Sequence, residues 1–231
     1  MGALAPNGNG VEAFWEALVD GRSGIGPITR FDATDFDIKI AGELTDFDPE
    51  VALDRKEVRR NDRFAHYGVH VATEAAMAAG VDMAVMDAER IGVIFGSGIG
   101  GIGTLESQHL VLQEKGPGRV SPFFVPSMIS DMFAGMISMK LGAKGPNYTT
   151  VSACASAAHA IGEAARKIQY DEADVMITGG SEAAITPMSV AGFTSAKAMA
   201  QRNNEPERAS RPFDADRNGF VLGEGGGALV L

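Results

Sequence analysis

Cysteine is almost absent from this chain of 231 residues, which contains only Cys154. A single thiol excludes a disulfide within the chain and a metal site built from several cysteines. It also suits a reducing compartment, so we expect a cytoplasmic protein. No apolar run approaches the roughly 20 residues that a membrane-spanning helix requires, and we therefore expect no membrane partner.

Basic residues are also few, because 20 lysines and arginines face 30 aspartates and glutamates and leave a net charge of −10. Proteins that bind nucleic acids are usually basic, so we expect no nucleic-acid partner. Glycine is abundant instead, with 29 residues and no collagen-like repeat. This excess predicts many tight turns and places where one backbone packs closely on another.

Short apolar runs bounded by glycine alternate with helical patterns along the chain. Strands are predicted at 90–96, 147–152 and 173–183, and a strand, a turn and a second strand at 220–231. Helices are predicted at 11–20, within 54–80, at 127–142, after Cys154 and at 191–200. This alternation predicts an α/β fold with a largely parallel sheet. Because the last apolar run stops at Leu231 without a polar cap, we expect a fragment of a longer protein.

Cys154 lies where a β-branched stretch meets an alanine-rich helical stretch. A thiol attacks as its thiolate, and the unpaired N–H groups and dipole at a helix N-terminus favour negative charge. The same N–H groups can hold the oxyanion that forms when a thioester carbonyl is attacked. Small neighbours leave room for an acyl chain, so Cys154 is a candidate nucleophile. A free cysteine that only packs in the core is the alternative interpretation.

A nucleophile usually needs a base, and four histidines are available: His66, His70, His109 and His159. His159 follows Cys154 by five positions, which on a helix is a rotation of about 500° and turns it toward another face. The other three lie far away in sequence. The residues alone therefore predict a nucleophile without an evident partner.

The segment around Cys154, "GPNYTTVSACASAAHAIGEAARKI", resembles the active-site segment of the β-ketoacyl-acyl-carrier-protein synthases. These are condensing enzymes of the thiolase superfamily, and the similarity is greatest to their elongating type II branch. Further segments match that family in order and spacing: "GSGIGGIGTLE", "SPFFVPSMISDM", "DEADVMITGGSEAAITP", "AGFTSAKAM" and "ASRPFDADRNGFVLGEGGGALVL". Several long motifs in register are far more specific than one short pattern.

The resemblance implies a thiolase-like layered α/β/α fold with a mostly parallel sheet, of which residues 1–231 would form the N-terminal half. The family's opening strand would precede Met1, and its second half would follow Leu231. That half carries the two histidines and the lysine of the family's active site. No histidine of this chain is therefore assigned to them, and we expect residues 1–231 alone to be inactive in condensation.

The resemblance also implies an acyltransferase, a 3-oxoacyl-[acyl-carrier-protein] synthase of fatty-acid biosynthesis. Cys154 would accept an acyl group from acyl carrier protein as a thioester. Decarboxylation of malonyl carrier protein would then supply the carbanion that attacks this thioester. The implied partners are acyl carrier protein, acyl and malonyl thioesters and a second copy of the chain, with no dissociable cofactor and no metal.

Three apolar residues correspond to substrate-binding positions of the family. Ile99 and Phe193 match positions that line the acyl pocket. Phe124 matches a segment that reaches toward the pocket of the partner subunit. Ordinary apolar packing is the alternative for all three.

Five basic residues lie within positions 55–63 of this acidic chain, where Arg55, Arg59 and Arg63 have i, i+4, i+8 spacing. Such a run is commonly a solvated helix face. The resemblance instead implies docking of the acidic carrier protein. The implied docking residues are Lys56, Arg59 and Arg60, with Arg119 and Lys197 as weaker members.

Other motifs in the chain suggest other functions. Positions 96–101 fit G-x-G-x-x-G after a strand, but the acidic residue that a dinucleotide site needs about 20 positions later is missing. Asp62, His66 and His70 have helical spacing that could suit a metal, but a solvated or hydrogen-bonded helix face explains them better. A polyketide-type ketosynthase and a truncated, non-catalytic dimerising scaffold stay as alternatives. The segment "VSACASA" favours a fatty-acid synthase over a polyketide-type ketosynthase. The presence of Cys154 argues against a non-catalytic scaffold.

Overall fold

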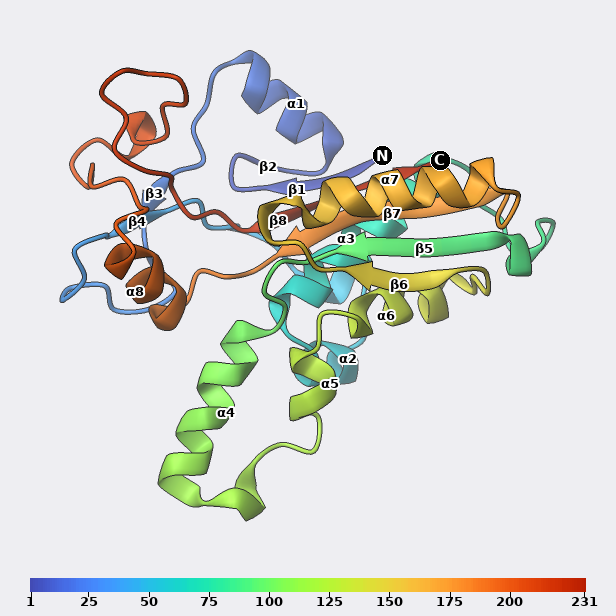
Figure 1. Ribbon diagram of the computed structural model, residues 1–231, viewed down its shortest axis with the longest axis horizontal. Helices are drawn as coiled ribbons and strands as arrows, with labels where there is room; N and C mark the ends of the chain where they lie inside the picture. Colours follow the sequence, from blue (N-terminus) through green and yellow to red (C-terminus); the bar gives the residue numbers. More distant parts are fainter.

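A computed structural model describes residues 1–231 and places one six-stranded sheet at the centre of the molecule (Figure 1). The order of its strands is β2-β1-β8-β7-β5-β6. These strands are β1 (Gly2–Ala5), β2 (Gly8–Asn9), β5 (Ile91–Gly96), β6 (Asn147–Thr150), β7 (Val175–Glu182) and β8 (Gly225–Val230). A separate pair joins β3 (Gly26–Pro27) and β4 (Ile40–Ala41).

The sheet is mixed. Strand β5 runs parallel to both β6 and β7, which is the predicted parallel arrangement. Strand β8 pairs antiparallel with β7 and β1, and β1 pairs antiparallel with β2. In the parallel part, Gly96 at the end of β5 aligns with Thr150 of β6 and Gly180 of β7. The carboxyl ends of these three strands therefore meet at one edge of the sheet.

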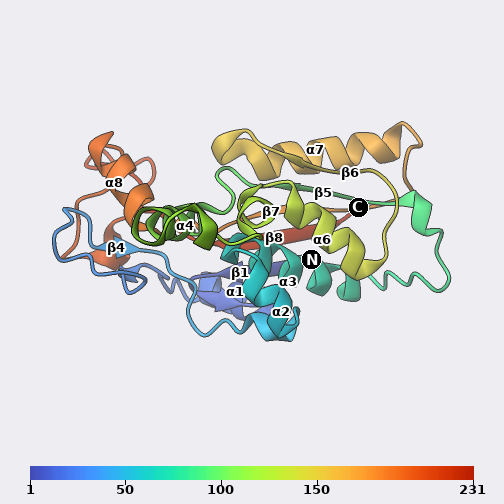
Figure 2. The same cartoon turned by 90° about the horizontal axis from the view of Figure 1, so that it is seen from below.

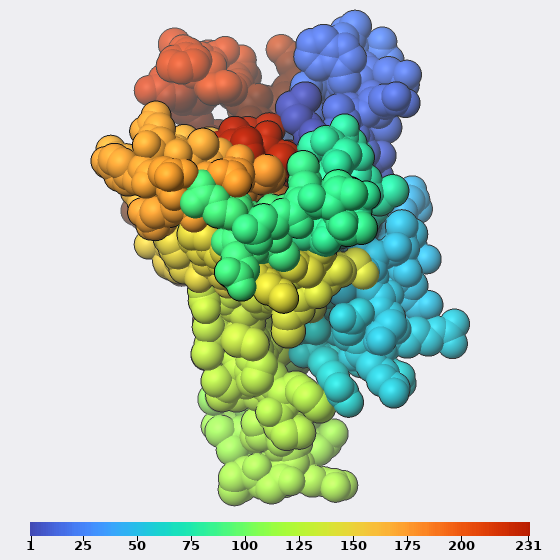
Figure 3. Space-filling model, turned by 90° about the vertical axis from the view of Figure 1, so that its right-hand side faces the viewer, coloured from blue at the N-terminus to red at the C-terminus, as the bar shows by residue number.

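Helices cover both faces of this sheet, which gives the predicted layered α/β architecture (Figure 2). They are α1 (Val11–Val19), α2 (Arg55–Arg60), α3 (Arg63–Ala78), α4 (Ile102–Lys115), α5 (Phe124–Met128), α6 (Met132–Leu141), α7 (Ser156–Gln169) and α8 (Pro187–Ser195). Helix α7 packs on β5 and β7 from one face, and α3 and α6 lie on the other. Helices α4 and α5 project from the body as a narrow extension (Figure 3). None of the helices has both the length and the apolar character to cross a membrane.

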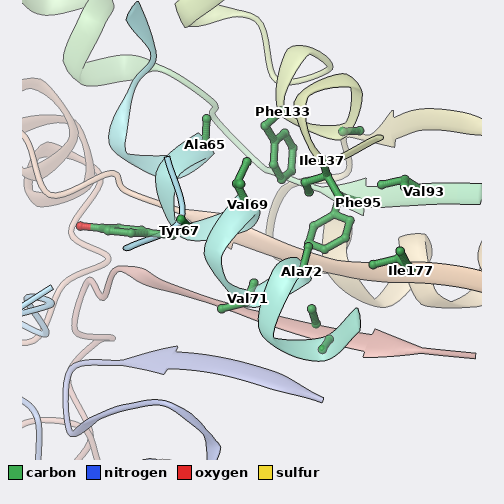
Figure 4. Packing of buried hydrophobic residues seen from close by; sticks show 14 of the residues in the cluster. Ala65, Tyr67, Val69, Val71, Ala72, Val93, Phe95, Phe133, Ile137 and Ile177 are labelled. Carbon is green, nitrogen blue, oxygen red and sulfur yellow. The ribbon is translucent and has the colours of Figure 1, made fainter. Parts of the chain in front are cut away.

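The main core lies between α3, α6 and the sheet (Figure 4). The ring of Phe133 is completely buried, and its centroid lies 5.2 Å from that of Phe64 and 5.6 Å from that of Phe95. Both pairs meet edge to face, a favourable geometry for aromatic rings. Gly68 of α3 faces this ring, and a Cβ there would lie 2.5 Å from a ring carbon of Phe133. The glycine therefore lets α3 approach α6 closely.

Two of the predicted elements are wrong. The single helix expected over 127–142 is divided into α5 and α6, because residues at the junction form hydrogen bonds with other segments. The Met128 carbonyl accepts a hydrogen bond from Gly101 N at 3.0 Å, and Asp131 Oδ1 accepts one from Thr149 N of β6 at 3.0 Å. The expected two strands at 220–231 are one strand, β8, because Phe220 and Gly223 form isolated bridges with distant segments instead.

The helix expected at 191–200 begins and ends earlier, at Pro187–Ser195. Thr186 caps it by accepting a hydrogen bond from Ser189 N at 3.3 Å. Proline suits the first helical position, because an N–H group there would have no hydrogen-bond partner within the helix.

We predict that Phe133→Ala lowers the free energy of unfolding by about 3–5 kcal/mol, because it removes a buried ring and leaves a cavity among Phe64, Phe95 and Gly68. Chemical denaturation followed by circular dichroism measures this loss. Phe213→Ala is the matched control, since the Phe213 side chain is 99% exposed and should cost almost nothing. Equal losses in the two variants would show that Phe133 does not anchor the core.

Candidate active site around Cys154

Cys154 lies in the short connection between β6 and α7. It is the middle residue of a single 3-10 turn, Ala153–Ala155, which leads directly into α7 at Ser156. The Ser156 hydroxyl donates a hydrogen bond to the Ala153 carbonyl at 2.7 Å and accepts one from Ser152 N at 2.9 Å. Ala153 has a φ of 51°, a left-handed conformation that is uncommon for a residue with a side chain. The turn therefore holds a strained backbone directly before the thiol.

The thiol is exposed. Only one face of α7 is buried, and it includes Ser156, Ala160 and Ala164. The sequence predicted Cys154 in the first turn of a buried helix, whereas the structure places it two residues before the first residue of α7. The reason is the bend at Ala153, which separates β6 from α7 by one tight turn.

Two glycines allow the first turn of α7 to lie directly on the sheet. A Cβ at Gly96 would overlap the backbone of Ser156 and Ala157. A Cβ at Gly180 would lie 2.7 Å from the Cβ of Ala157, which is closer than such atoms approach. Only glycine fits at both strand ends. The position of Cys154 over the carboxyl ends of β5 and β7 therefore depends on them.

A cavity of about 650 Å³ opens beside Cys154. Its lining brings together three residues that the sequence singled out: Cys154, Ile99 from the loop after β5, and Phe193 from α8. Phe193 packs edge to face against Phe220 of the same cavity, with ring centroids 5.2 Å apart. Phe124 does not line the cavity, because it begins α5 in the projecting part.

Glu182 at the end of β7 is a cavity residue that the sequence analysis missed. Its Oε2 accepts hydrogen bonds from Gly98 N at 2.7 Å and Ile99 N at 3.0 Å. Its Oε1 accepts one from Ser97 Oγ at 3.2 Å, and this hydroxyl accepts one from Gly100 N at 3.1 Å. Burial raises the pKa of Glu182 above its ordinary value, while the N–H and hydroxyl donors act in the opposite direction.

This arrangement argues against a dinucleotide site at positions 96–101. In such a site the backbone N–H groups of the glycine-rich loop hold a phosphate. Here Gly98 N and Ile99 N already bind the carboxylate of Glu182 from the same chain. The sequence contains both the glycine-rich loop and Glu182, but they are more than 80 positions apart, and only the structure shows that they are hydrogen-bonded.

The histidines lie elsewhere, and the cavity lining includes none of them. His159 is on α7, where its Nδ1 lies 2.6 Å from Ser152 Oγ. His66 and His70 are on α3, with His66 Nε2 3.1 Å from the Val58 carbonyl and the His70 ring against Phe47. Burial holds the pKa of both rings below the ordinary value for histidine.

Asp62, the third member of the possible metal set, is the N-cap of α3, and its Oδ2 accepts hydrogen bonds from Thr104 N and Thr104 Oγ1, both at 2.7 Å. The three side chains therefore have separate partners.

Comparison with known proteins gives the family. The family model described as beta-ketoacyl synthase, N-terminal domain, matches residues 1–231. The chain belongs to the β-ketoacyl synthase family. A 3-oxoacyl-[acyl-carrier-protein] synthase 2 from Synechocystis sp. is 52% identical over the whole chain, which covers 56% of that protein. The β-ketoacyl synthase domain described above thus spans about half the length of the curated relatives it matches.

Solved structures share the fold of this β-ketoacyl synthase domain. A crystal structure of a beta-ketoacyl synthase from Burkholderia phymatum superposes with a TM-score of 0.87 at 29% identity, covering 99% of this chain and 56% of that one. A type II polyketide ketosynthase, solved in complex with its acyl-carrier protein, gives a TM-score of 0.73 at 24% identity. It covers 86% of this chain and 54% of that chain and supports the fold alone. The thiolase-like α/β prediction is confirmed.

The five basic residues expected to dock the carrier protein lie on three segments of this β-ketoacyl synthase domain. Lys56, Arg59 and Arg60 are on α2, where Arg60 lies over the ring of Phe123, 4.5 Å from its centroid. Arg119 ends the 3-10 turn before α5, and Lys197 follows α8 with a φ of 54°.

The expected row of Arg55, Arg59 and Arg63 is broken. Helix α2 ends at Arg60, and Arg63 begins α3 and pairs with the buried carboxylate of Glu224 at 3.5 Å. Arg63 is therefore part of an internal ion pair and not of the exposed row.

We predict that Gly96→Ala lowers stability and slows alkylation of Cys154 by iodoacetamide, because the added Cβ forces the first turn of α7 away from β5. Gly162→Ala on the same helix is the control. A Cβ there meets nothing within 4 Å, so alanine should stabilise α7 by about 0.5–1 kcal/mol. Melting curves and mass spectrometry of the single thiol measure both effects. An unchanged alkylation rate in Gly96→Ala would contradict the role given to this glycine.

Proposed function

We propose that the protein carrying this domain is an elongating 3-oxoacyl-[acyl-carrier-protein] synthase of fatty-acid biosynthesis, with Cys154 as the residue that accepts the acyl group. One observation carries the proposal: the only thiol of the chain is exposed in the turn directly before α7 and lines a cavity large enough for an acyl chain. The name of the 52% identical relative supports the reaction and the carrier.

The first half-reaction follows from this geometry. The Cys154 thiolate attacks the carbonyl carbon of the acyl thioester, the new S–C bond forms, and the carrier leaves as its thiolate. The start of α7 lies next to the sulfur, and the N–H groups of a helix start stabilise negative charge that develops on a carbonyl oxygen. The mainly small residues around Cys154, among them Ala153, Ala155 and Ala157, leave space for the thioester to approach.

The second half-reaction forms the carbon–carbon bond. Malonyl carrier protein loses CO2, the resulting carbanion attacks the acyl carbon, and the Cys154 thiolate leaves. The family resemblance assigns the decarboxylation to two histidines and a lysine in the half of the enzyme that follows this domain. None of the four histidines of residues 1–231 lines the cavity, which is consistent with that assignment. We therefore expect residues 1–231 to need that half for condensation.

The acyl chain is proposed to lie against Ile99 and Phe193, which share the cavity with the thiol. Phe124 is proposed to act at the pocket of a partner subunit in a homodimer, because it lies in the projecting part of the molecule and away from its own cavity. No dissociable cofactor is required, since the thioester itself supplies the activation. One free thiol suits a reducing cytoplasm.

Acyl carrier protein is proposed to dock on Lys56, Arg59 and Arg60, with Arg119 and Lys197 as weaker contacts. The net charge of −10 repels an acidic partner at long range. A local basic cluster dominates within one Debye length, about 8 Å at physiological salt. The Phe123 ring holds the Arg60 guanidinium in place, so part of this cluster is ordered before the partner arrives.

We predict that the full-length protein carrying this chain gains one acyl group from acyl carrier protein, and that Cys154→Ala abolishes this gain. Intact-mass spectrometry detects the adduct, and peptide mapping locates it. Alkylation with iodoacetamide is the control for access to the thiol. If the wild-type protein is alkylated but never acylated, the non-catalytic scaffold becomes the correct interpretation.

We predict that Arg59→Glu in the full-length protein raises the KM for carrier-linked substrate severalfold and flattens its dependence on salt, because rim charges act mainly on association. Turnover of a small thioester without a carrier should change little. Arg22→Glu is the control, since it alters the net charge equally and lies on the loop after α1. Equal effects of the two substitutions would show that net charge matters and that α2 is not the docking site.

A further inference from the structure

The loop that carries Ile99 has an unusual anchor. Residues 97–100 connect β5 to the segment before α4, and Ser97 N donates one long hydrogen bond, 3.4 Å, to the Thr150 carbonyl of β6. Gly98 N, Ile99 N and the Ser97 hydroxyl converge on the carboxylate of Glu182. Hydrogen bonds to an ionised acceptor are about twice as strong as neutral ones. One side chain at the end of β7 therefore binds three consecutive residues of the loop, Ser97, Gly98 and Ile99.

The loop also lies close to the turn that carries the thiol. A Cβ at Gly98 would lie 3.1 Å from Glu182 Oε2 and 3.2 Å from the Ala153 carbonyl oxygen, so the loop passes closely between them. Ala153 directly precedes Cys154. The backbone of Ile99 is thus fixed on one side by Glu182, while the loop touches the turn that carries the thiol. The Ile99 side chain itself is 39% exposed and lines the cavity.

We propose that Glu182 is a positioning residue that sets the acyl-chain length accepted at Cys154 by fixing the backbone of Ile99. This inference rests on the proposed function. A side chain can limit the length of a chain in a cavity only if its backbone stays in place, and the two hydrogen bonds to Oε2 supply that restraint. Glu182 does not touch the reacting atoms in this proposal and acts through Ile99.

The test compares kcat/KM for a long and a short acyl thioester in the full-length enzyme. Glu182→Gln keeps the shape of the side chain but removes the charge, and its amide group cannot accept all three donors. The loop should then be less restrained, so that Ile99 can move aside for the longer chain. We expect the ratio of kcat/KM for the long to that for the short thioester to rise by about tenfold, the low end of discrimination by an apolar pocket. Ser97→Ala removes one donor and should shift the ratio in the same direction but less. It also serves if Glu182→Gln fails to fold.

The chain contains a matched control. Glu43 is buried, its Oε1 accepts hydrogen bonds from Thr29 N at 2.8 Å and Arg30 N at 3.0 Å, and its Oε2 accepts one from Thr29 Oγ1 at 2.6 Å. It thus binds two consecutive N–H groups and one hydroxyl, like Glu182, but does not line the cavity of Cys154. Glu43→Gln should lower the melting temperature to a similar extent and leave the long-to-short ratio unchanged.

A double-mutant cycle separates positioning from general loss of structure. In an Ile99→Ala background there is no side chain left to position, so Glu182→Gln should no longer change the ratio. The proposal is overturned if the ratio stays constant in Glu182→Gln and Ser97→Ala, if Glu43→Gln shifts it equally, or if the shift persists without the Ile99 side chain. A wild-type enzyme that forms no acyl adduct at Cys154 would instead refute the proposed function, and the role of Glu182 with it.

Discussion

The close approach of α7 to the ends of β5 and β7 is the constraint on which the site depends. Gly96 and Gly180 have no side chains, so the first turn of the helix rests directly on the sheet. This contact forces the chain to pass from β6 into α7 through one tight turn with a left-handed Ala153. Cys154 is placed at that turn, and its exposure beside the cavity follows from the same geometry.

Buried carboxylates hold several irregular segments of the molecule. Glu182 binds the loop that carries Ile99, and Glu43 binds Thr29 and Arg30 in the same manner. Glu224 has a completely buried side chain that accepts hydrogen bonds from Leu44 N and Arg30. A buried charge is costly unless hydrogen bonds compensate it. These acidic residues therefore satisfy the backbone of long irregular segments that no strand or helix could pair.

The family motifs and the buried strands could be predicted from the sequence, because each rests on neighbouring residues. The apolar run 90–96 became β5, and the alanine-rich stretch after Cys154 became α7. The helix expected over 127–142 failed for a non-local reason. Met128 and Asp131 bond to Gly101 and Thr149, which lie far away in the chain, and these bonds interrupt the helix.

The sequence by itself determined the α/β class, the family and the placement of its single thiol between a strand and a helix, because these follow from composition, periodicity and motifs. Only the tertiary structure decided that Ile99 and Phe193 share a cavity with Cys154, that Phe124 does not, and that Arg63 turns inward to Glu224. Such pairings join segments that are remote in the chain. They arise when the sheet and its helices pack, and no local pattern of residues encodes them.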